Sequence, residues 1–156
     1  MSDRQAIRPH EIATDAPLPR DASIAFIGVI RTPWTRREDC PHQGKPDGPE
    51  CVIELTPPWD RALDGIEGFD TIEVFYWLHL SRRDLLVQNP RHANAPRGTF
   101  SLRSPIRPNP IGASTVRLVR RDGPRLVVRG LECVDGTPLI DLKPDHCHYT
   151  PPKAGD

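Results

Sequence analysis

The stretch STVRLVRRDGPRLVVRGLECV, residues 114–134, decides the fold of this 156-residue chain. Apolar and polar residues alternate from Ser114 to Arg121, which is the period of a strand with one buried face. A second strand is predicted from Arg125 to Val134. Asp122-Gly123-Pro124 between them is typical of a hairpin turn. We therefore expect an antiparallel hairpin here.

Short apolar runs outside this hairpin predict further strands. The run Thr71–His79 is aromatic or β-branched nearly throughout, which predicts a strand buried on both faces. A short helix is predicted at Trp59–Gly65 because Pro57-Pro58 suits a helix start. At least six strands with one helix and no βαβ alternation indicate an all-β fold, an antiparallel barrel or sandwich. The other predicted strands are Ser23–Ile30, Cys51–Leu55, Thr99–Leu102 and Pro138–Leu142.

Length and composition favour one domain, from residue 23 to residue 144. Residues 1–22 are interpreted as a loose leader, residues 33–50 as a long proline-rich loop, and residues 145–156 as a polar tail. The longest uncharged apolar run is far shorter than the roughly 20 residues of a membrane span, and the first residues lack a secretory signal pattern. We expect a cytoplasmic protein with four reduced cysteines.

A net charge of zero hides two segments of opposite sign. Residues 38–80 hold ten acidic and two basic residues, a net −8, whereas residues 81–130 hold eleven basic and two acidic residues, a net +9. All eleven bases are arginine, which favours planar, bidentate recognition of phosphate or carboxylate. Either the two segments pair within the fold or the basic segment has an anionic partner.

The densest feature is the loop Arg103-Ser104-Pro105-Ile106-Arg107-Pro108-Asn109-Pro110. Its prolines fix their own φ and keep each preceding residue out of helical angles. Two arginines and an asparagine are thus held on a stiff support, which lowers the entropy lost when a ligand binds. A plain surface connection between strands is the alternative interpretation. We expect this loop to lie beside the Asp135–Asp141 region.

Asp135 and Asp141 are the candidate proton acceptors. Asp135-Gly136 is first of all a turn signal, and Asp141 shares a strand face with Lys143. Metal binding is not expected, because Cys40-Pro41-His42 and His146-Cys147-His148 lack the spacing of zinc ligands. The sequence also lacks the glycine-rich dinucleotide, P-loop and serine-hydrolase motifs.

These segments resemble the TsaA/TrmO-type (YaeB-like) family of S-adenosylmethionine-dependent tRNA methyltransferases. The likeness is most specific over residues 98–112, GTFSLRSPIRPNPIG, and continues in Val134–Pro138 and Asp141–Pro144. It extends over about residues 24–144. The resemblance implies a small TsaA-like β-barrel that forms a homodimer. It implies methyl transfer to N6 of the threonylcarbamoyl-modified adenosine beside the tRNA anticodon.

For the site itself, we expect Arg107, Asn109 and Lys143 to contact the RNA, and Asp135 or Asp141 to take the proton shed by the amine. Two alternatives remain: a non-catalytic module that binds S-adenosylmethionine or RNA, and a methyltransferase for small molecules. The implied S-adenosylmethionine contacts are Pro41, His42, Gln43, His79, Leu80, Arg103, Ala113, Cys133, Val134, Asp135 and Gly136.

Overall fold

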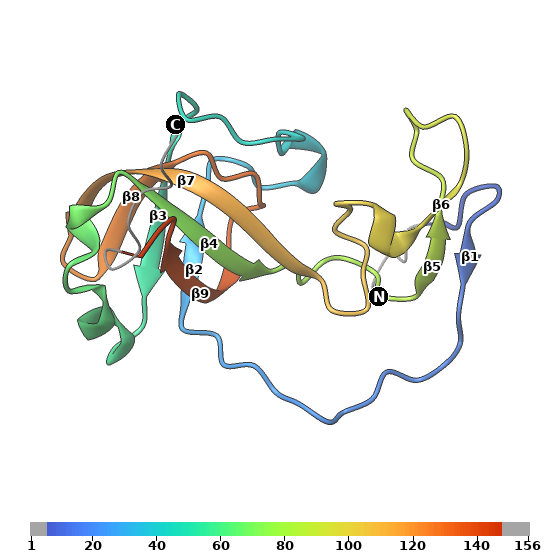
Figure 1. Cartoon of the computed structure of the whole chain (residues 1–156), viewed down its shortest axis with the longest axis horizontal. Coiled ribbons are helices and arrows are strands. Elements are labelled where there is room, and N and C mark those ends of the chain that lie inside the picture. Colours follow the sequence, from blue (N-terminus) through green and yellow to red (C-terminus); the bar gives the residue numbers. More distant parts are fainter. Residues whose placement is uncertain (1–5, 148–156) are drawn as a thin grey trace. The chain divides into compact units, whose positions relative to one another are not determined.

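A closed six-stranded barrel forms the main part of the structure, a computed structural model that describes residues 6–147 (Figure 1). The strand order around the barrel is β2-β3-β8-β7-β4-β9, and the pairings are antiparallel. The predicted all-β barrel is therefore confirmed. Its strands are β2 (Gly28–Arg31), β3 (Glu50–Leu55), β4 (Thr71–Trp77), β7 (Ile111–Asp122), β8 (Arg125–Arg129) and β9 (Thr137–Pro144).

The chain divides into two compact units. Residues 25–76 and those from 113 onward make the barrel unit, while residues up to 24 and residues 77–112 make the small unit. β4 runs from the barrel unit into the small unit, and β7 returns from it. This grouping differs from the predicted division into 1–22, 23–144 and 145–156, whose boundaries stay a prediction. Residues 148–156 of the predicted tail lie outside the described residues.

The barrel core is built by strict alternation. Along β7 every second residue from Gly112 to Val116 is buried, and β3 buries Cys51, Ile53 and Leu55. β4 also alternates: Ile72, Val74 and Tyr76 are buried, and the residues between them are partly exposed. The prediction that this strand is buried on both faces was wrong, because the outer face of a single-layer barrel is open to solvent.

The predicted hairpin is confirmed, with β7 and β8 joined at Gly123-Pro124. β8 ends at Arg129, earlier than predicted, because Gly130 has a φ of 113° and turns the chain. The predicted strand at Thr99–Leu102 was wrong, since Thr99–Ser101 is the short 3₁₀ helix η4. The predicted helix at Trp59–Gly65 is the 3₁₀ helix η2 (Trp59–Leu63).

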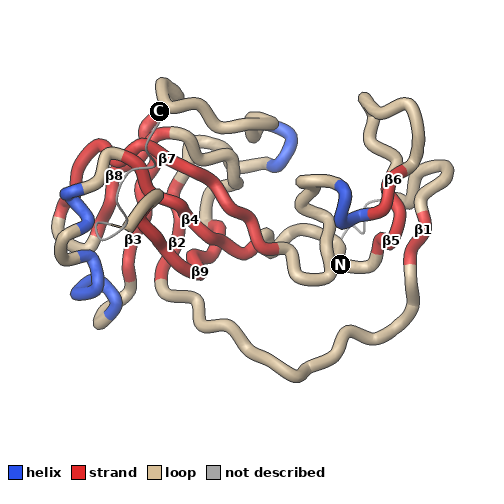
Figure 2. Tube along the Cα trace, in the orientation of Figure 1, coloured by secondary structure: helices blue, strands red, loops and turns tan. Residues whose placement is uncertain are grey.

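The connections are long, and two further 3₁₀ turns lie in them: η1 (Arg37–Asp39) and η3 (Ile66–Gly68) (Figure 2). The predicted strand at Ser23–Ile30 begins only at Gly28, and Ile24 and Phe26 before it are about half exposed.

Part of the charge asymmetry is resolved within the barrel unit. Glu54 on β3 lies 3.7 Å from Arg125, and Glu50 lies 3.2 Å from Arg129. Arg121 reaches both Asp64 and Glu67, at 3.3 Å and 3.2 Å. The acidic and basic segments therefore pair with each other here, as one of the two alternatives predicted. Such exposed pairs add little stability, about 0–1 kcal/mol each.

The small unit contains a three-stranded sheet in the order β1-β5-β6. The strands are β1 (Ile12–Ala13), β5 (Leu85–Gln88) and β6 (Arg97–Gly98). β1 belongs to the predicted loose leader, so that segment is not wholly irregular. Glu11 fastens it: its side chain is 2% exposed and accepts hydrogen bonds from the amides of Arg8 (2.9 Å) and Asn89 (3.1 Å). Among the described residues, no helix is long and apolar enough to cross a membrane.

Replacing Glu11 by Gln should loosen this attachment. Burial alone would raise the pKa of Glu11, but the Arg8 and Asn89 amides and the Arg8 guanidinium outweigh it and lower the pKa. The stabilisation is therefore present above the ordinary pKa of a glutamate and is lost as the pH falls through the lowered value. We expect amide exchange at Asn89 to be about tenfold faster in Glu11→Gln at neutral pH, a loss of ~1–2 kcal/mol of local stability.

Asp15→Asn is the matched control, because Asp15 is exposed and makes no hydrogen bond or ion pair among the described residues. Equal exchange rates at Asn89 in wild type and Glu11→Gln would contradict the assigned role.

Candidate functional site

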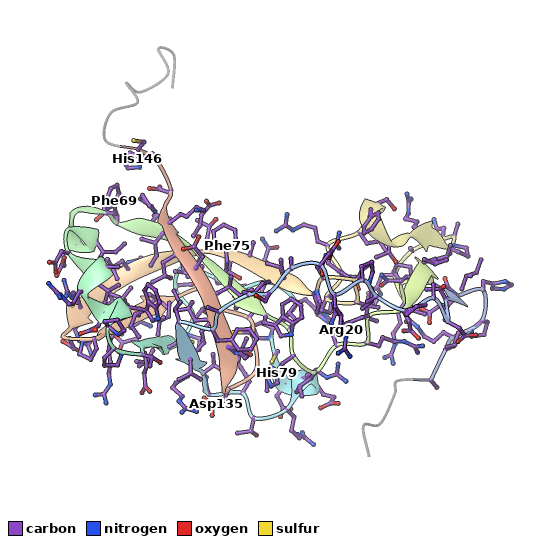
Figure 3. All side chains as sticks on the ribbon, turned by 90° about the horizontal axis from the view of Figure 1, so that it is seen from below. Arg20, Phe69, Phe75, His79, Asp135 and His146 are labelled. Atoms are coloured by element: carbon purple, nitrogen blue, oxygen red, sulfur yellow. The ribbon has the colours of Figure 1, made fainter. Side chains whose placement is uncertain are left out.

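A backbone crossing holds the Asp135 turn in place within the barrel unit. The amide of Asp135 donates to the carbonyl of Trp34 (2.7 Å), and the amide of Gly136 donates to that of Ile30 (2.9 Å). Thr32 adds a hydroxyl bond to the Cys133 carbonyl (2.9 Å). Residues 133–136 are thereby fixed against the end of β2, at the end of the barrel where β9 begins (Figure 3).

The Asp135 carboxylate is held by two neighbours of β2. Its Oδ1 accepts a hydrogen bond from the Thr32 amide at 3.1 Å, and its Oδ2 lies 3.8 Å from the Arg31 guanidinium. The side chain is still 35% exposed. Gly136 follows with a φ of 81°, which a side chain rarely tolerates. The turn thus presents an oriented carboxylate that retains lone pairs for a ligand.

The predicted loop residues Pro41, His42 and Gln43 lie next to Gly44, which contacts the chain just after the end of β8. Gly44 makes the contact: a Cβ added there would lie 1.7 Å from the carbonyl oxygen of Gly130. The Gly44 amide also donates to Glu132 Oε2 at 2.7 Å. Of the two clusters predicted as cofactor contacts, residues 41–43 are therefore fastened next to Gly130 and Glu132, and residues 133–136 are fastened to residues 30–34.

Asp141 has a different environment, on β9. Its Oδ1 accepts from the Leu142 amide (2.9 Å), and its Oδ2 lies 3.0 Å from Lys143 Nζ. The prediction that Asp141 and Lys143 share a face is confirmed by this contact. The Lys143 ammonium also lies 6.0 Å from the centre of the Phe75 ring. Farther along, His146 packs edge-on against Phe69 (Figure 3).

The two buried thiols are unsuited to nucleophilic work. Burial raises the pKa of Cys133 to about 12 and that of Cys51 to about 11. Neither is a thiolate at neutral pH, and the thiolate is the reactive form. The Cys133 side chain therefore packs in the core, and its backbone carbonyl accepts the hydrogen bond from the Thr32 hydroxyl.

The small unit holds the remaining predicted residues, and polar bonds shape its proline loop. Gln88, 3% exposed, donates to Thr99 Oγ1 (3.0 Å) and to the Ile106 carbonyl (2.9 Å). Thr99 donates in turn to the Leu85 carbonyl at 2.6 Å. A buried amide with satisfied partners fixes the backbone around it. The proline loop is therefore fastened to β5.

Arginines complete this framework. Arg83 Nε donates to the Pro108 carbonyl (2.5 Å), and Arg107 Nη1 donates to the carbonyls of Leu102 (2.6 Å) and Ser104 (3.2 Å). Arg107 thus braces the loop from inside. The Leu78 amide donates to the Pro110 carbonyl at 2.8 Å, which fastens the segment of His79 and Leu80 to the end of the same loop.

The structure therefore divides the predicted residues between the two units. His79, Leu80, Arg103, Arg107 and Asn109 lie in the small unit, and the others, with the exposed Ala113 of β7, lie in the barrel unit. Because the proline loop and the Asp135–Asp141 region belong to different units, their expected adjacency stays a prediction. His79 is exposed, so it is not part of the core.

Sequence reasoning missed the residues that orient the clusters. Glu132 fastens a glycine 88 residues away, and Gln88 fastens a loop 18 residues away. Neither lies in a motif. No local pattern marks a side chain whose partner is a backbone group brought near only by folding.

Residues 29–150 match the family described as tRNA-methyltransferase O N-terminal domain. The chain belongs to the TrmO N-terminal domain family. The matched region covers the barrel strands and the whole segment 77–112. The predicted TrmO-type resemblance is therefore confirmed.

Relatives in this family carry two kinds of description. A probable S-adenosyl-L-methionine-binding protein, VirR of Rhizobium radiobacter, is 50% identical over 89% of this chain and 79% of its own length. The tRNA (adenine(37)-N6)-methyltransferase of Escherichia coli is 35% identical over 76% of this chain and 55% of its own. A TrmO crystal structure from Pseudomonas aeruginosa aligns with a TM-score of 0.65 at 30% identity, covering 86% of this chain and 59% of that one. The chain spans little more than half of the last two proteins.

Replacing Gly44 by Ala should disrupt the fastening of the 41–44 loop. The added methyl would meet the Gly130 carbonyl, which is backbone and cannot rotate away. We expect a loss of about 1–3 kcal/mol in the free energy of unfolding, measured by urea titration. Gly98→Ala is the control, since nothing lies within 4 Å of its Cβ position. Equal losses in both variants would show that the close approach is not the cause.

The buried thiols should resist alkylation in the native protein. Because they are buried and their pKa values are raised, Cys51 and Cys133 should stay unmodified by iodoacetamide at neutral pH, and the exposed Cys147 should react. Peptide mass analysis before and after unfolding in urea measures this. Rapid native modification of Cys133 would contradict its placement in the core.

Proposed function

We propose that this chain is an S-adenosylmethionine-dependent methyltransferase that methylates N6 of threonylcarbamoyladenosine beside the anticodon of tRNA. The observation that carries the proposal is the family match over residues 29–150. The matching family is described as the N-terminal domain of tRNA-methyltransferase O. The E. coli relative, named for adenine-37 N6 methylation, supports the tRNA acceptor and the position. Two relatives named as binding S-adenosyl-L-methionine support the methyl donor. A tRNA acceptor also implies a cytoplasmic protein.

The residues of the barrel unit fit such a donor. S-adenosylmethionine presents ribose hydroxyls, an ammonium and a sulfonium, all of which favour an oriented carboxylate acceptor. Asp135 supplies one, with its Oδ1 fixed by the Thr32 amide and the side chain partly exposed. The donor also carries a carboxylate, for which Arg103 of the small unit is the proposed partner. The further contacts proposed for S-adenosylmethionine are Pro41, His42, Gln43, His79, Leu80, Ala113, Cys133, Val134 and Gly136.

The chemistry asks the protein mainly to align two reactants. The donor supplies an activated methyl group, and the adenine N6 attacks it in line with the breaking carbon–sulfur bond. Positioning of this kind can supply roughly 7–11 kcal/mol of barrier reduction. The attacking amine then sheds one proton. A carboxylate within hydrogen-bond reach would accept it.

Asp135 is the better candidate for that proton. Asp141 already has a direct ammonium partner at 3.0 Å, which occupies its Oδ2. Arg31 lies farther from Asp135, at 3.8 Å, and is itself half exposed. Asp135 is also the carboxylate oriented by a backbone amide distant in sequence, that of Thr32 just after β2. We therefore assign the acceptor role to Asp135, with Lys143, Arg107 and Asn109 proposed as contacts to the RNA.

The test is incubation of total tRNA with the protein and methyl-labelled S-adenosylmethionine, followed by mass analysis of nucleosides. Labelled N6-methyl threonylcarbamoyladenosine is expected. Asp135→Asn should lower kcat by about 10²–10⁴-fold and weaken S-adenosylmethionine binding much less, because the Asn Oδ1 still accepts from the Thr32 amide and keeps the turn in shape. Asp47→Asn, an exposed carboxylate of the 41–50 loop, is the control and should leave kcat unchanged.

Every other outcome would change one part of the proposed function. A larger kcat loss in Asp141→Asn than in Asp135→Asn would reassign the acceptor. Heat of S-adenosylmethionine binding without any transfer would favour a non-catalytic binding module, which the names of several relatives allow. Label found only in small metabolites would exclude tRNA as the acceptor. Sedimentation equilibrium tests the proposed homodimer.

A further inference from the structure

The turn that leads into the proline loop of the small unit carries a large aromatic residue that is mostly open to solvent. Phe100 is 79% exposed, the most exposed of the large hydrophobic side chains in the described residues. Its neighbour Thr99 points inward and is 4% exposed. An apolar ring held in water costs free energy in the isolated protein. A ligand that covers the ring would remove this cost.

The turn that carries the ring is rigid. On one side of Phe100, Thr99 donates to the Leu85 carbonyl and accepts from Gln88. On the other side, Ser101 Oγ donates to the Gly98 carbonyl at 2.8 Å. Side-chain bonds thus fix the backbone both before and after the ring. A ligand that covers Phe100 would have little backbone to order, which favours binding.

The ring is also polarised from one side. The Arg107 guanidinium lies 5.9 Å from the ring centre, within the range of a cation–π contact. Two carbonyls hold that guanidinium in place. With 79% of the residue still exposed, the ring keeps a face on which a planar group can stack.

The chain segment that contains the ring carries charge of one sign. Residues 85–112 contain four arginines and one histidine and no aspartate or glutamate. The side chains of Arg91, Arg97 and Arg103 are exposed and make no hydrogen bond or ion pair among the described residues, unlike those of Arg121, Arg125 and Arg129 of the barrel unit. This half of the charge asymmetry is not neutralised within the described part of the chain. An anionic partner would release counterions on binding it.

We propose that Phe100 is a stacking platform for an unpaired base of the RNA acceptor, flanked by Arg91 and Arg97, which contact its phosphates. An exposed aromatic ring among unpaired cations is the arrangement by which proteins hold single-stranded nucleic acid. The inference rests on the proposed function. It adds which part of the acceptor RNA the protein recognises, namely an unpaired base of a loop and not a paired stem. A two-fold contact between copies centred on the ring would set the same arginines against each other, which costs free energy.

The test measures binding of a labelled anticodon stem-loop RNA and of a blunt RNA duplex of equal length by fluorescence anisotropy. Phe100→Ala should weaken stem-loop binding at least about fivefold and leave duplex binding unchanged. Phe100→Trp should keep the affinity. Phe100→Leu should lose it, because leucine is apolar but cannot stack. Trp59→Ala, which removes a half-exposed aromatic of the barrel unit, is the matched control and should have no effect.

The charge requirement is tested separately. Arg97→Gln should reduce the slope of log affinity against log salt by about 0.7–1, the change expected when the protein neutralises one phosphate fewer. Arg125→Gln, whose guanidinium is paired with Glu54, should leave the slope unchanged. Equal slopes in wild type and Arg97→Gln would remove the phosphate contact from the proposal.

Several outcomes would overturn the platform. Wild-type affinity in Phe100→Ala would do so, and so would full affinity in Phe100→Leu, which would mark a plain apolar contact. A shift of Phe100→Ala from dimer to monomer in sedimentation equilibrium, with stem-loop binding kept, would assign the ring to a subunit contact. If the wild-type protein binds the stem-loop through Phe100 but transfers no methyl group, the proposed function is wrong and the stacking role of Phe100 is kept. If wild type methylates tRNA and Phe100→Ala does so with unchanged KM, only the platform falls.

Discussion

The crossing of residues 30–34 by residues 133–136 is the constraint on which the barrel unit depends. Two amide-to-carbonyl bonds, a hydroxyl bond from Thr32 and the Asp135 carboxylate join β2 to the turn before β9. The same bonds continue the β2–β9 pairing that closes the barrel. Closure and presentation of the carboxylate are thus one set of hydrogen bonds. The turn residues cannot shift without opening a barrel seam, so the carboxylate is placed as firmly as the sheet itself.

The small unit is held together by other means. Among its described residues only Leu85, Gln88, Thr99, Pro110 and Gly112 are buried, and two of these are polar. So small a core supplies little hydrophobic stabilisation, because few apolar groups leave water. Side-chain bonds to backbone carbonyls take over, from Gln88, Arg83 and Arg107. They need particular geometry, so they hold the proline loop in one shape and still leave its outer surface free for a ligand.

Local patterns identified the barrel strands well and the loops poorly. The hairpin of β7 and β8, the aromatic run of β4 and the Asp-Gly turn all carry their signal within a few residues, because alternation and turn chemistry are local. Thr99–Ser101 did not form a strand, since buried bonds from Thr99 to Leu85 and Gln88 draw it into a 3₁₀ turn. β5 and β6 were missed because short strands with irregular burial leave no period to detect.

The sequence alone determined the all-β class, the family, the rigid proline loop and the two candidate carboxylates, because alternation, proline stereochemistry and motif identity are properties of neighbouring residues. Tertiary structure decided which charges are used internally and which remain free. Arg107 turns inward to carbonyls and Arg121 turns to Asp64, while Arg97 keeps its charge exposed. It also decided that the Thr32 amide orients Asp135, 103 residues away in the sequence. The physical reason is that an ion pair or a hydrogen bond depends on separation in space, and residues far apart in sequence acquire that separation only when the chain folds.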